Sequence, residues 1–309
     1  MKIANFKILK LSAIALLMVL SFSSCDKDDT PAVATETLDA KITANSELSI
    51  FQAALEKTRL TSFTKGGGPF TVWAPTNAAF NAIGIMSAAD LNAIDSNTLV
   101  QIITYHIQVG SRSYLEIPLG PNANMLTQGG LTQYASRKPG GSAYINGAQV
   151  TQPDIRTSNG YMHIIDRVLL PPFLTAAQAL AGQANYARFY QAVLKTATVT
   201  TTNPLTFFAV PNSAMVAAGY DSTTIANASG TALTTLTGII RYHVVNRRIF
   251  SPDFVAGPLK TVQGGNVTIN TTGGLTVKGT NNPAPFTITA NNIITTTGVI
   301  HTINGLLKP

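Results

Sequence analysis

The chain has few side chains that could take part in chemistry, and its histidines are the most informative of them. The sequence contains four, which are His106, His163, His243 and His301. Two of these follow a tyrosine, in Tyr105-His106 and Tyr242-His243. Histidine titrates near neutral pH and can act as a base, a proton donor or a metal ligand. Both Tyr-His pairs lie within apolar runs, however, which favours buried residues that hold the core together.

No segment joins a histidine to a reactive partner in a recognised pattern. The sequence lacks Gly-x-Ser-x-Gly, His-Glu-x-x-His and closely spaced cysteines. Gly66-Gly67-Gly68 has no following Lys and Ser or Thr and precedes Pro69, which indicates a turn rather than a phosphate loop. The sequence therefore predicts no catalytic residue, no cofactor and no metal ion, and a protein that is not an enzyme. A hydrolase using His106 or His163 is the alternative.

The first 25 residues have the pattern of an export signal. Basic residues at Lys2, Lys7 and Lys10 precede an apolar segment of 12 residues, Leu11 to Phe22, which is too short to span a membrane. Small residues then lead to Cys25, and this junction resembles the lipobox of bacterial lipoproteins, with Phe22 where leucine is usual. We therefore expect residues 1–25 to be a lipoprotein signal peptide whose Cys25 becomes lipidated and holds the protein to the membrane.

Residues 26–38 have no apolar period and are expected to form a flexible tether. They begin with Asp26-Lys27-Asp28-Asp29, which resembles the surface-export signal of Bacteroidetes lipoproteins, although an ordinary solvated spacer has the same composition. We expect an outer-membrane lipoprotein exposed at the cell surface. Since Cys25 is the only cysteine, the exported part has no disulfide.

Charge argues against a nucleic-acid partner. The formal net charge is +7, and it falls to +4 without the three lysines that precede Cys25. The remaining basic residues are scattered and form no arginine-rich run or recognisable DNA-binding motif. The expected ligand is instead an extracellular protein or polysaccharide.

An internal repeat organises the rest of the chain. Three blocks of the first half return in the same order at offsets of 135 to 138 residues. They are Phe70–Phe80 and Leu205–Met215, Ile102–Ile107 and Ile239–Val244, and Gly160–Ile165 and Gly298–Ile303. The repeat predicts two domains, 39–171 and 172–309, which we call the first and second repeat.

Each repeat is expected to be an α+β domain. Apolar residues at helical spacing, such as Phe51 and Leu55 or Phe189 and Val193, predict an early amphipathic helix. The runs 70–74 and 205–209 predict buried strands, after which Asn77 or Asn212 would cap a helix. The last third of each repeat has Gly-Gly and Asn-Gly pairs between short β-branched runs, which is typical of hairpins.

These three repeated blocks resemble, in order, the two conserved segments and the terminal strand of the fasciclin domain. The resemblance covers about 39–309 and implies two tandem fasciclin-like domains, each a wedge-shaped β-sandwich with several short helices. It also implies an extracellular adhesion or binding protein. The alternative is a glycan-binding accessory lipoprotein for polysaccharide capture, in which exposed tyrosines would stack on sugars. Its candidates are Tyr114, Tyr134, Tyr144 and Tyr161.

The resemblance leaves two roles open for Tyr105-His106 and Tyr242-His243. The corresponding pair of some animal family members is implicated in integrin binding, whereas the apolar neighbours favour a structural role. A weaker resemblance concerns Asp221-Ser222-Thr223, which is similar to the O-glycosylation site of exported Bacteroidetes proteins.

Overall fold

The computed structural model of the chain describes residues 34–198 and 204–309. The predicted signal peptide, Cys25 and residues 26–33 of the predicted tether lie outside the described residues.

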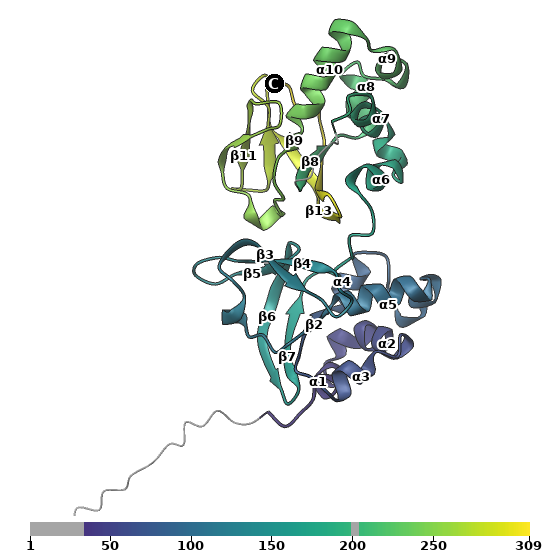
Figure 1. Cartoon of the computed structure of the whole chain (residues 1–309), viewed down its shortest axis with the longest axis vertical. Coiled ribbons are helices and arrows are strands. Elements are labelled where there is room, and N and C mark those ends of the chain that lie inside the picture. The colour runs from purple at the N-terminus through teal and green to yellow at the C-terminus, as the bar shows by residue number, and fades with distance from the viewer. Residues whose placement is uncertain (1–33, 199–203) are drawn as a thin grey trace, which may run out of the picture. The chain divides into compact units, whose positions relative to one another are not determined.

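The first repeat places its helices before and between its first strands and ends in a run of strands (Figure 1). Its helices are α1 (Leu38–Ala44), α2 (Ser49–Lys57), α3 (Thr61–Lys65), α4 (Asn77–Asn81) and α5 (Ser96–Tyr105). Its strands are β1 (Phe70–Pro75), β2 (Ile107–Val109), β3 (Gly120–Leu126), β4 (Thr132–Arg137), β5 (Ala143–Ile145), β6 (Ala148–Thr157) and β7 (Gly160–Ile165).

The second repeat has the same succession of strands, but two of its helices precede the first strand and three follow it. Its helices are α6 (Ala176–Ala181), α7 (Ala187–Lys195), α8 (Asn212–Ala217), α9 (Ser222–Asn227) and α10 (Gly230–Tyr242). Its strands are β8 (Leu205–Ala209), β9 (Val244–Val245), β10 (Gly257–Lys260), β11 (Asn266–Asn270), β12 (Thr276–Lys278), β13 (Phe286–Thr295) and β14 (Gly298–Ile303).

Both repeats build one sheet of seven strands with the same topology. The order is β2-β1-β7-β6-β5-β4-β3 in the first repeat and β9-β8-β14-β13-β12-β11-β10 in the second. In each, the buried first strand pairs in parallel with the last strand and antiparallel with the short second strand. The predicted duplication and the α+β class are therefore confirmed.

The sheet of the first repeat has a core on each face, because side chains alternate along a strand. Val72 and Ala74 of β1 pack with the helices, whereas Trp73 between them packs with residues of β3 to β5 such as Ala135 and Ile145. The strands β3 to β5 thus cover the face of β1 and β7 that the helices leave free. This arrangement gives the repeat its sandwich character, with the helices gathered on one side (Figure 1).

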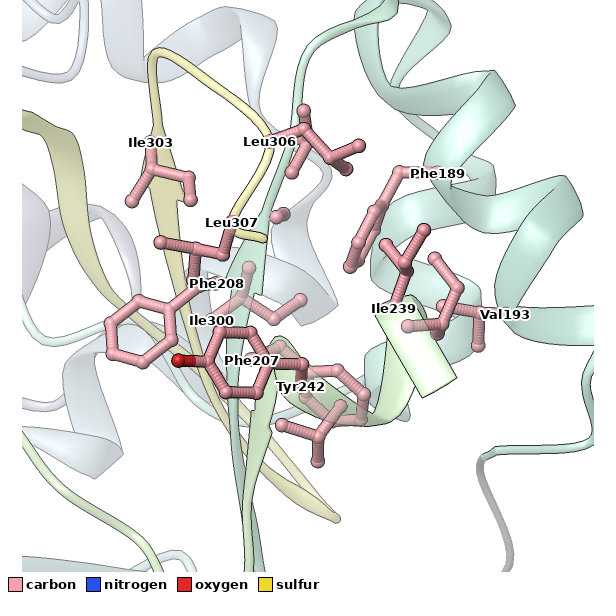
Figure 2. Close-up of a cluster of buried hydrophobic side chains, with 14 of the residues drawn as sticks. Phe189, Val193, Phe207, Phe208, Ile239, Tyr242, Ile300, Ile303, Leu306 and Leu307 are labelled. Atoms are coloured by element: carbon pink, nitrogen blue, oxygen red, sulfur yellow. The ribbon is translucent and has the colours of Figure 1, made fainter. Parts of the chain in front are cut away.

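The core of the second repeat shows why the predicted helix forms. Phe189 and Val193 lie four residues apart on α7 and are fully buried, and Figure 2 shows them near Ile239 of α10 and Phe207 of β8. Each such side chain contributes about 2 kcal/mol when it leaves water. Leu194 does not share this face: 55% of its surface is exposed.

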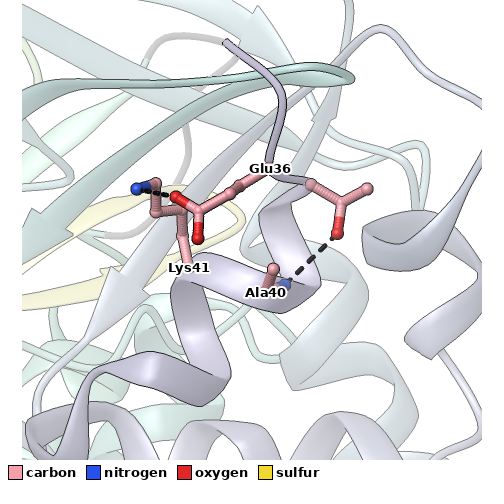
Figure 3. Close-up of polar contacts among 4 residues, drawn as sticks. Glu36, Ala40 and Lys41 are labelled. Carbon is pink, nitrogen blue, oxygen red and sulfur yellow. Dashed lines mark hydrogen bonds and ion pairs between the residues drawn. The ribbon is translucent and has the colours of Figure 1, made fainter.

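The start of α1 is fixed by its own sequence (Figure 3). The side chain of Thr37 accepts a hydrogen bond from the amide of Ala40, which is a standard N-cap. The carboxylate of Glu36 forms an ion pair with Lys41, the one ion pair within the described residues. The cap of α1 at Thr37 and the start of the helix at Leu38 therefore lie inside the segment 26–38 that the sequence assigned to the tether.

Asn77 and Asn212 both cap a helix, but the prediction that each caps the helix following it is wrong. Thr76 caps α4, and α8 has no side-chain cap. The Asn77 side chain instead accepts from the amide of Ile50 at 3.0 Å and donates to the carbonyl of Ser46 at 3.0 Å, so it caps α2. Asn212 makes the equivalent contacts with the start of α7. Each asparagine thus serves a helix that precedes it in the chain, which local sequence patterns do not reveal.

A glycine marks the closest approach of the parallel strands in each repeat. Gly160 and Gly298 have φ angles of +148° and +153°. A Cβ atom there would lie 1.8 Å from the Phe70 carbonyl oxygen or 1.9 Å from that of Leu205. Only glycine fits, which explains why this position is glycine in both repeats.

Candidate functional site

His106 lies at the end of α5, directly after Tyr105, and is fully buried. Its Nδ1 is 2.7 Å from the Ile102 carbonyl oxygen, and its Nε2 is 2.9 Å from the Leu169 amide nitrogen. A carbonyl can only accept and an amide can only donate. The ring therefore carries its proton on Nδ1, and both nitrogens are satisfied within the domain.

His243 repeats this arrangement at the end of α10. Its Nδ1 is 2.8 Å from the Ile239 carbonyl oxygen, and its Nε2 is 2.9 Å from the Leu307 amide nitrogen. Each histidine thus ties the last turn of a helix to the segment that follows the final strand of its repeat. In each repeat, this bridge joins the helix before the second strand to the segment after the last strand.

His163 and His301 form a second matched pair, on the central strands β7 and β14. His163 donates from Nε2 to the Arg112 carbonyl at 2.9 Å and accepts at Nδ1 from the Asp154 amide at 3.2 Å. His301 donates from Nε2 to the Ile249 carbonyl at 2.8 Å, and its Nδ1 lies 3.4 Å from the Asn292 amide. Both rings are completely surrounded by protein.

The residues that donate to these two histidines lie in matching β-bulges. Asp154 and Asn292 have φ angles of 58° and 63°, in the left-handed region, where Asp and Asn occur more readily than most residues. The bulges interrupt β6 and β13 and turn one backbone amide toward the histidine. Sequence reasoning missed these positions, since the only available signal is an Asp or Asn nine residues before each histidine.

Burial keeps these rings neutral. It lowers the pKa of His106, His243 and His301 to about 4, against the opposing effect of the backbone carbonyl that each ring donates to. Burial also lowers the pKa of His163. A neutral imidazole with both nitrogens bonded has no free lone pair for a metal ion or a substrate proton.

The tyrosines of the Tyr-His pairs are also committed to the fold. The Tyr105 hydroxyl donates to the Thr132 carbonyl at 2.9 Å and accepts from the Asn146 amide group at 2.8 Å. The Tyr242 hydroxyl donates to the Asn266 carbonyl, the matching position of the second repeat. Burial raises the pKa of Tyr105, which keeps its hydroxyl protonated.

The predicted Tyr-His pairs therefore lie in the two cores and present no group at the surface. A partner that approached either repeat would meet neither ring nor hydroxyl. Within the described residues, no three histidine, cysteine or acidic side chains gather as a metal site would require. The geometry favours the structural role of Tyr105, His106, Tyr242 and His243.

The tyrosines considered for sugar stacking are only partly exposed. Each has an intermediate exposure, and three have a cation over the ring. Arg248 lies 3.8 Å from the centre of the Tyr134 ring. Arg137 lies 5.5 Å from the centre of the Tyr114 ring, and Lys138 lies 5.7 Å from that of Tyr144. Such rings offer a sugar less free face than an exposed platform would.

The segment Asp221-Ser222-Thr223 starts a helix. Asp221 caps α9 by accepting from the amide of Thr224 at 2.7 Å, and Ser222 donates to Gln191 at 2.9 Å. Thr223 is exposed. Its glycosylation stays a prediction, as does the lipidation of Cys25, which lies outside the described residues.

No helix in the described part of the chain is both long and apolar enough to cross a membrane.

The comparisons with known proteins agree with the repeated architecture. The family model of the fasciclin domain matches twice, over residues 46–171 and 184–309. Each match covers one of the two repeats and includes its Tyr-His pair.

Two bacterial relatives illustrate the range of similarity. Protein sll1483 of Synechocystis is 33% identical over 129 residues, which are 41% of this chain and 69% of that protein. The cell surface glycolipoprotein MPB83 of Mycobacterium bovis is 34% identical over 110 residues, which are 35% of this chain and 47% of that protein. A solved FAS1 domain pair from the insect cell adhesion molecule fasciclin I aligns with 88% of this chain and 96% of its own, at 19% identity and a TM-score of 0.41.

Proposed function

Because the chain belongs to the fasciclin domain family, we propose that it is a non-enzymatic adhesion or binding protein at the outer surface of a bacterial cell. In this proposal, Cys25 carries the lipid that anchors the chain to the outer membrane, and the two repeats bind an extracellular protein or polysaccharide. The proposed anchor follows from the lipoprotein-like pattern of residues 1–25.

One observation supports the non-enzymatic part above all. All four histidines use both ring nitrogens in hydrogen bonds within their own repeat. An enzyme of the hydrolase class needs a histidine or acid that faces a reacting group in a cleft. The described residues contain no exposed histidine that meets this requirement.

Support for the anchor comes from sequence and from a relative. Small residues before Cys25 follow an apolar segment of signal-peptide length, and a single cysteine there has no disulfide partner. The relative MPB83 is named as a cell surface glycolipoprotein.

The anchor is tested by expressing the native chain and a Cys25→Ser variant in a bacterium that processes lipoproteins. Mass spectrometry of the N-terminal peptide should show a lipid on Cys25, and the variant should leave the membrane fraction. Protease treatment of intact cells should remove the repeats if they face outward. An unmodified Cys25, or a variant that stays equally bound to the membrane, would refute the anchor.

Binding is tested with the purified protein on arrays of envelope polysaccharides and extracellular matrix proteins. The expected result is retention of a subset of these ligands by the protein. The alternative function, a glycan-binding accessory lipoprotein for polysaccharide capture, predicts retention of glycans alone. Failure to retain any ligand of either class would contradict both functions.

A further inference from the structure

The two repeats carry very different charge. Residues 34–171 contain nine Lys and Arg and nine Asp and Glu, so the first repeat has no formal net charge. Residues 172–309 contain eight basic residues but only Asp221 and Asp253 as acids, which gives the second repeat +6. A charge of this size on one domain attracts anionic partners.

Part of this charge lies along one edge of the second repeat. The two outermost strands of the sheet, β9 and β10, approach each other where the amide of Val262, just after β10, donates to the Val244 carbonyl of β9 at 2.7 Å. This bond brings Lys260, two residues before Val262, toward Arg247, three residues after Val244, and the Gln263 amide donates to the carbonyl of Arg241 at 3.2 Å. We call Arg241, Arg247 and Lys260 the basic edge.

The side chains of the basic edge are free to meet a ligand. All three are exposed, and none takes part in an ion pair or a side-chain hydrogen bond with another described residue. Of the two acids of the repeat, Asp221 caps α9, and the half-buried Asp253 lines a hollow together with Arg247 and accepts a hydrogen bond from Ser136. Two acids leave most of the positive charge of the repeat uncompensated.

The same edge of the first repeat has no charge. Thr104, Gly110 and Leu126 occupy the positions of Arg241, Arg247 and Lys260. Leu126 and its neighbour Val109 are exposed by 66% and 67%. The fold therefore does not require basic residues there, since an identical framework forms without them.

A groove runs beside the basic edge on α10. It has a volume of about 490 Å³ and is lined by Leu233, Thr234, Thr237, Gly238, Arg241 and Gln263. No atom lies within 4 Å of where a Cβ of Gly238 would be, so this glycine leaves the groove open. In the first repeat Gln101 holds the equivalent position, and the hollow beside it, which Pro172 and Phe173 also line, measures about 300 Å³.

We propose that the basic edge and this groove bind an acidic polysaccharide that carries uronate carboxylates. The proposal rests on the binding function above and names the chemistry of its ligand. Arginine and lysine pair with carboxylates, while threonine and glutamine side chains suit sugar hydroxyls. Among the residues that line the groove, Leu233 is the one large apolar side chain and none is aromatic, so the groove offers little that would enter a lipid surface or stack on nucleic-acid bases.

The test measures binding of the purified protein to polygalacturonate at near-physiological salt, with highly methyl-esterified polygalacturonate as the uncharged probe. The protein should bind the acidic polymer and lose affinity as salt rises. The triple variant Arg241→Gln, Arg247→Gln, Lys260→Gln should lose about tenfold or more in affinity, because three charge contacts are removed.

Three further variants separate local from general effects. Lys195→Gln on α7 removes one charge from the same repeat away from the edge and should bind like the parent, whereas Arg241→Gln alone should bind measurably more weakly. Gly238→Gln introduces the residue of the first repeat into the groove. It should weaken binding without any change of charge, and folding is not at risk because glutamine favours helix more than glycine does.

The proposal is overturned if the triple variant binds like Lys195→Gln, if the methyl-esterified polymer binds equally well, or if phosphatidylglycerol vesicles compete better than polygalacturonate. Retention of a neutral glycan or a matrix protein with no effect of these variants would refute the basic edge and leave the adhesion function standing. Retention of no ligand at all would refute both.

Discussion

Where the two outermost strands of each sheet approach each other, the two repeats present different surfaces to solvent. Val109 and Leu126 lie there in the first repeat, and Asn246 and Lys260 in the second. In the cores beneath, by contrast, the histidines bond to matching backbone groups in both repeats, at distances that differ by no more than 0.2 Å. Duplication has thus preserved the hydrogen bonds that hold the fold and changed the surface.

This difference teaches where to look for function in a duplicated chain. A side chain that recurs in both repeats and is buried serves the fold first, because both copies need it. A side chain that differs while the fold stays the same is free to serve a ligand. By this criterion the Tyr-His pairs are framework, and the basic edge is a site of recognition.

Acid should have the largest effect on stability, because protonating a buried, neutral histidine is unfavourable in the folded state. Their folded pKa of about 4 lies below the ordinary value of about 6.5. Unfolded chains therefore bind more protons between these values, so stability is complete above about pH 6.5 and is lost as pH falls toward 4. For each of these histidines, the stability lost on acidification is on the order of 3 kcal/mol. The second repeat contains two of them, His243 and His301.

The single tryptophan makes the two repeats separately observable. Trp73 lies in the first repeat, so urea unfolding followed by its fluorescence reports that repeat alone, while circular dichroism reports both. We expect the free energy of unfolding of the second repeat to fall by about 6 kcal/mol from pH 7 to pH 4. Equal stability of the second repeat at both pH values would contradict the assignment of neutral, buried rings.

Removal of one histidine should have the next largest effect. The substitution His106→Ala leaves the Ile102 carbonyl and the Leu169 amide without partners and opens a cavity, at a cost of about 4 kcal/mol. The tryptophan-detected unfolding transition should move to lower urea concentration by that amount.

The matched substitution His243→Ala provides the control. It should leave the tryptophan transition unchanged and shift only the transition of the second repeat seen by circular dichroism. If His106→Ala kept its stability but lost ligand binding, the structural role of the pair would be wrong.

Much of this architecture can be predicted from sequence, since duplication reveals itself in repeated blocks. The strands at Phe70–Pro75 and Leu205–Ala209 were predicted to within one residue, because β-branched and aromatic runs end at proline. The contacts of Asn77 were not predicted, because its partner Ile50 lies 27 residues earlier and only folding brings the two residues together. The basic edge escaped sequence reasoning for the same reason: its residues look scattered along the chain.

The asparagines that cap α2 and α7 offer a smaller test of the shared framework. Asn77→Ala removes the acceptor for Ile50 and the donors to Ser46 and Ser49, so the first repeat should lose about 2 kcal/mol. Asn212→Ala removes two hydrogen bonds and should cost the second repeat less. Thermal unfolding of both variants measures the difference. A loss below about 0.5 kcal/mol in Asn77→Ala would show that the cap contributes little.

The smallest effect concerns a buried polar pair that only the first repeat has. Gln108 donates to Gln133 at 2.9 Å, and Gln133 donates to the Tyr105 carbonyl. The second repeat has Val245 and Val267 at these positions, both buried. Since the fold accepts either pair, we expect a loss of stability only when one glutamine is replaced and the other is left without its hydrogen-bond partner.

The double substitution Gln108→Val, Gln133→Val should therefore change the stability of the first repeat by less than about 1 kcal/mol, because it reproduces the apolar pair of the second. The single substitution Gln133→Val should cost about 2 kcal/mol, since it strands the Gln108 amide and the Tyr105 carbonyl in the core. Urea titrations of the two singles and the double, read by Trp73 fluorescence, give the coupling energy directly. Additive losses would mean that the two repeats hold Tyr105 and Tyr242 by different means, and their shared framework would then be narrower than the common histidine contacts imply.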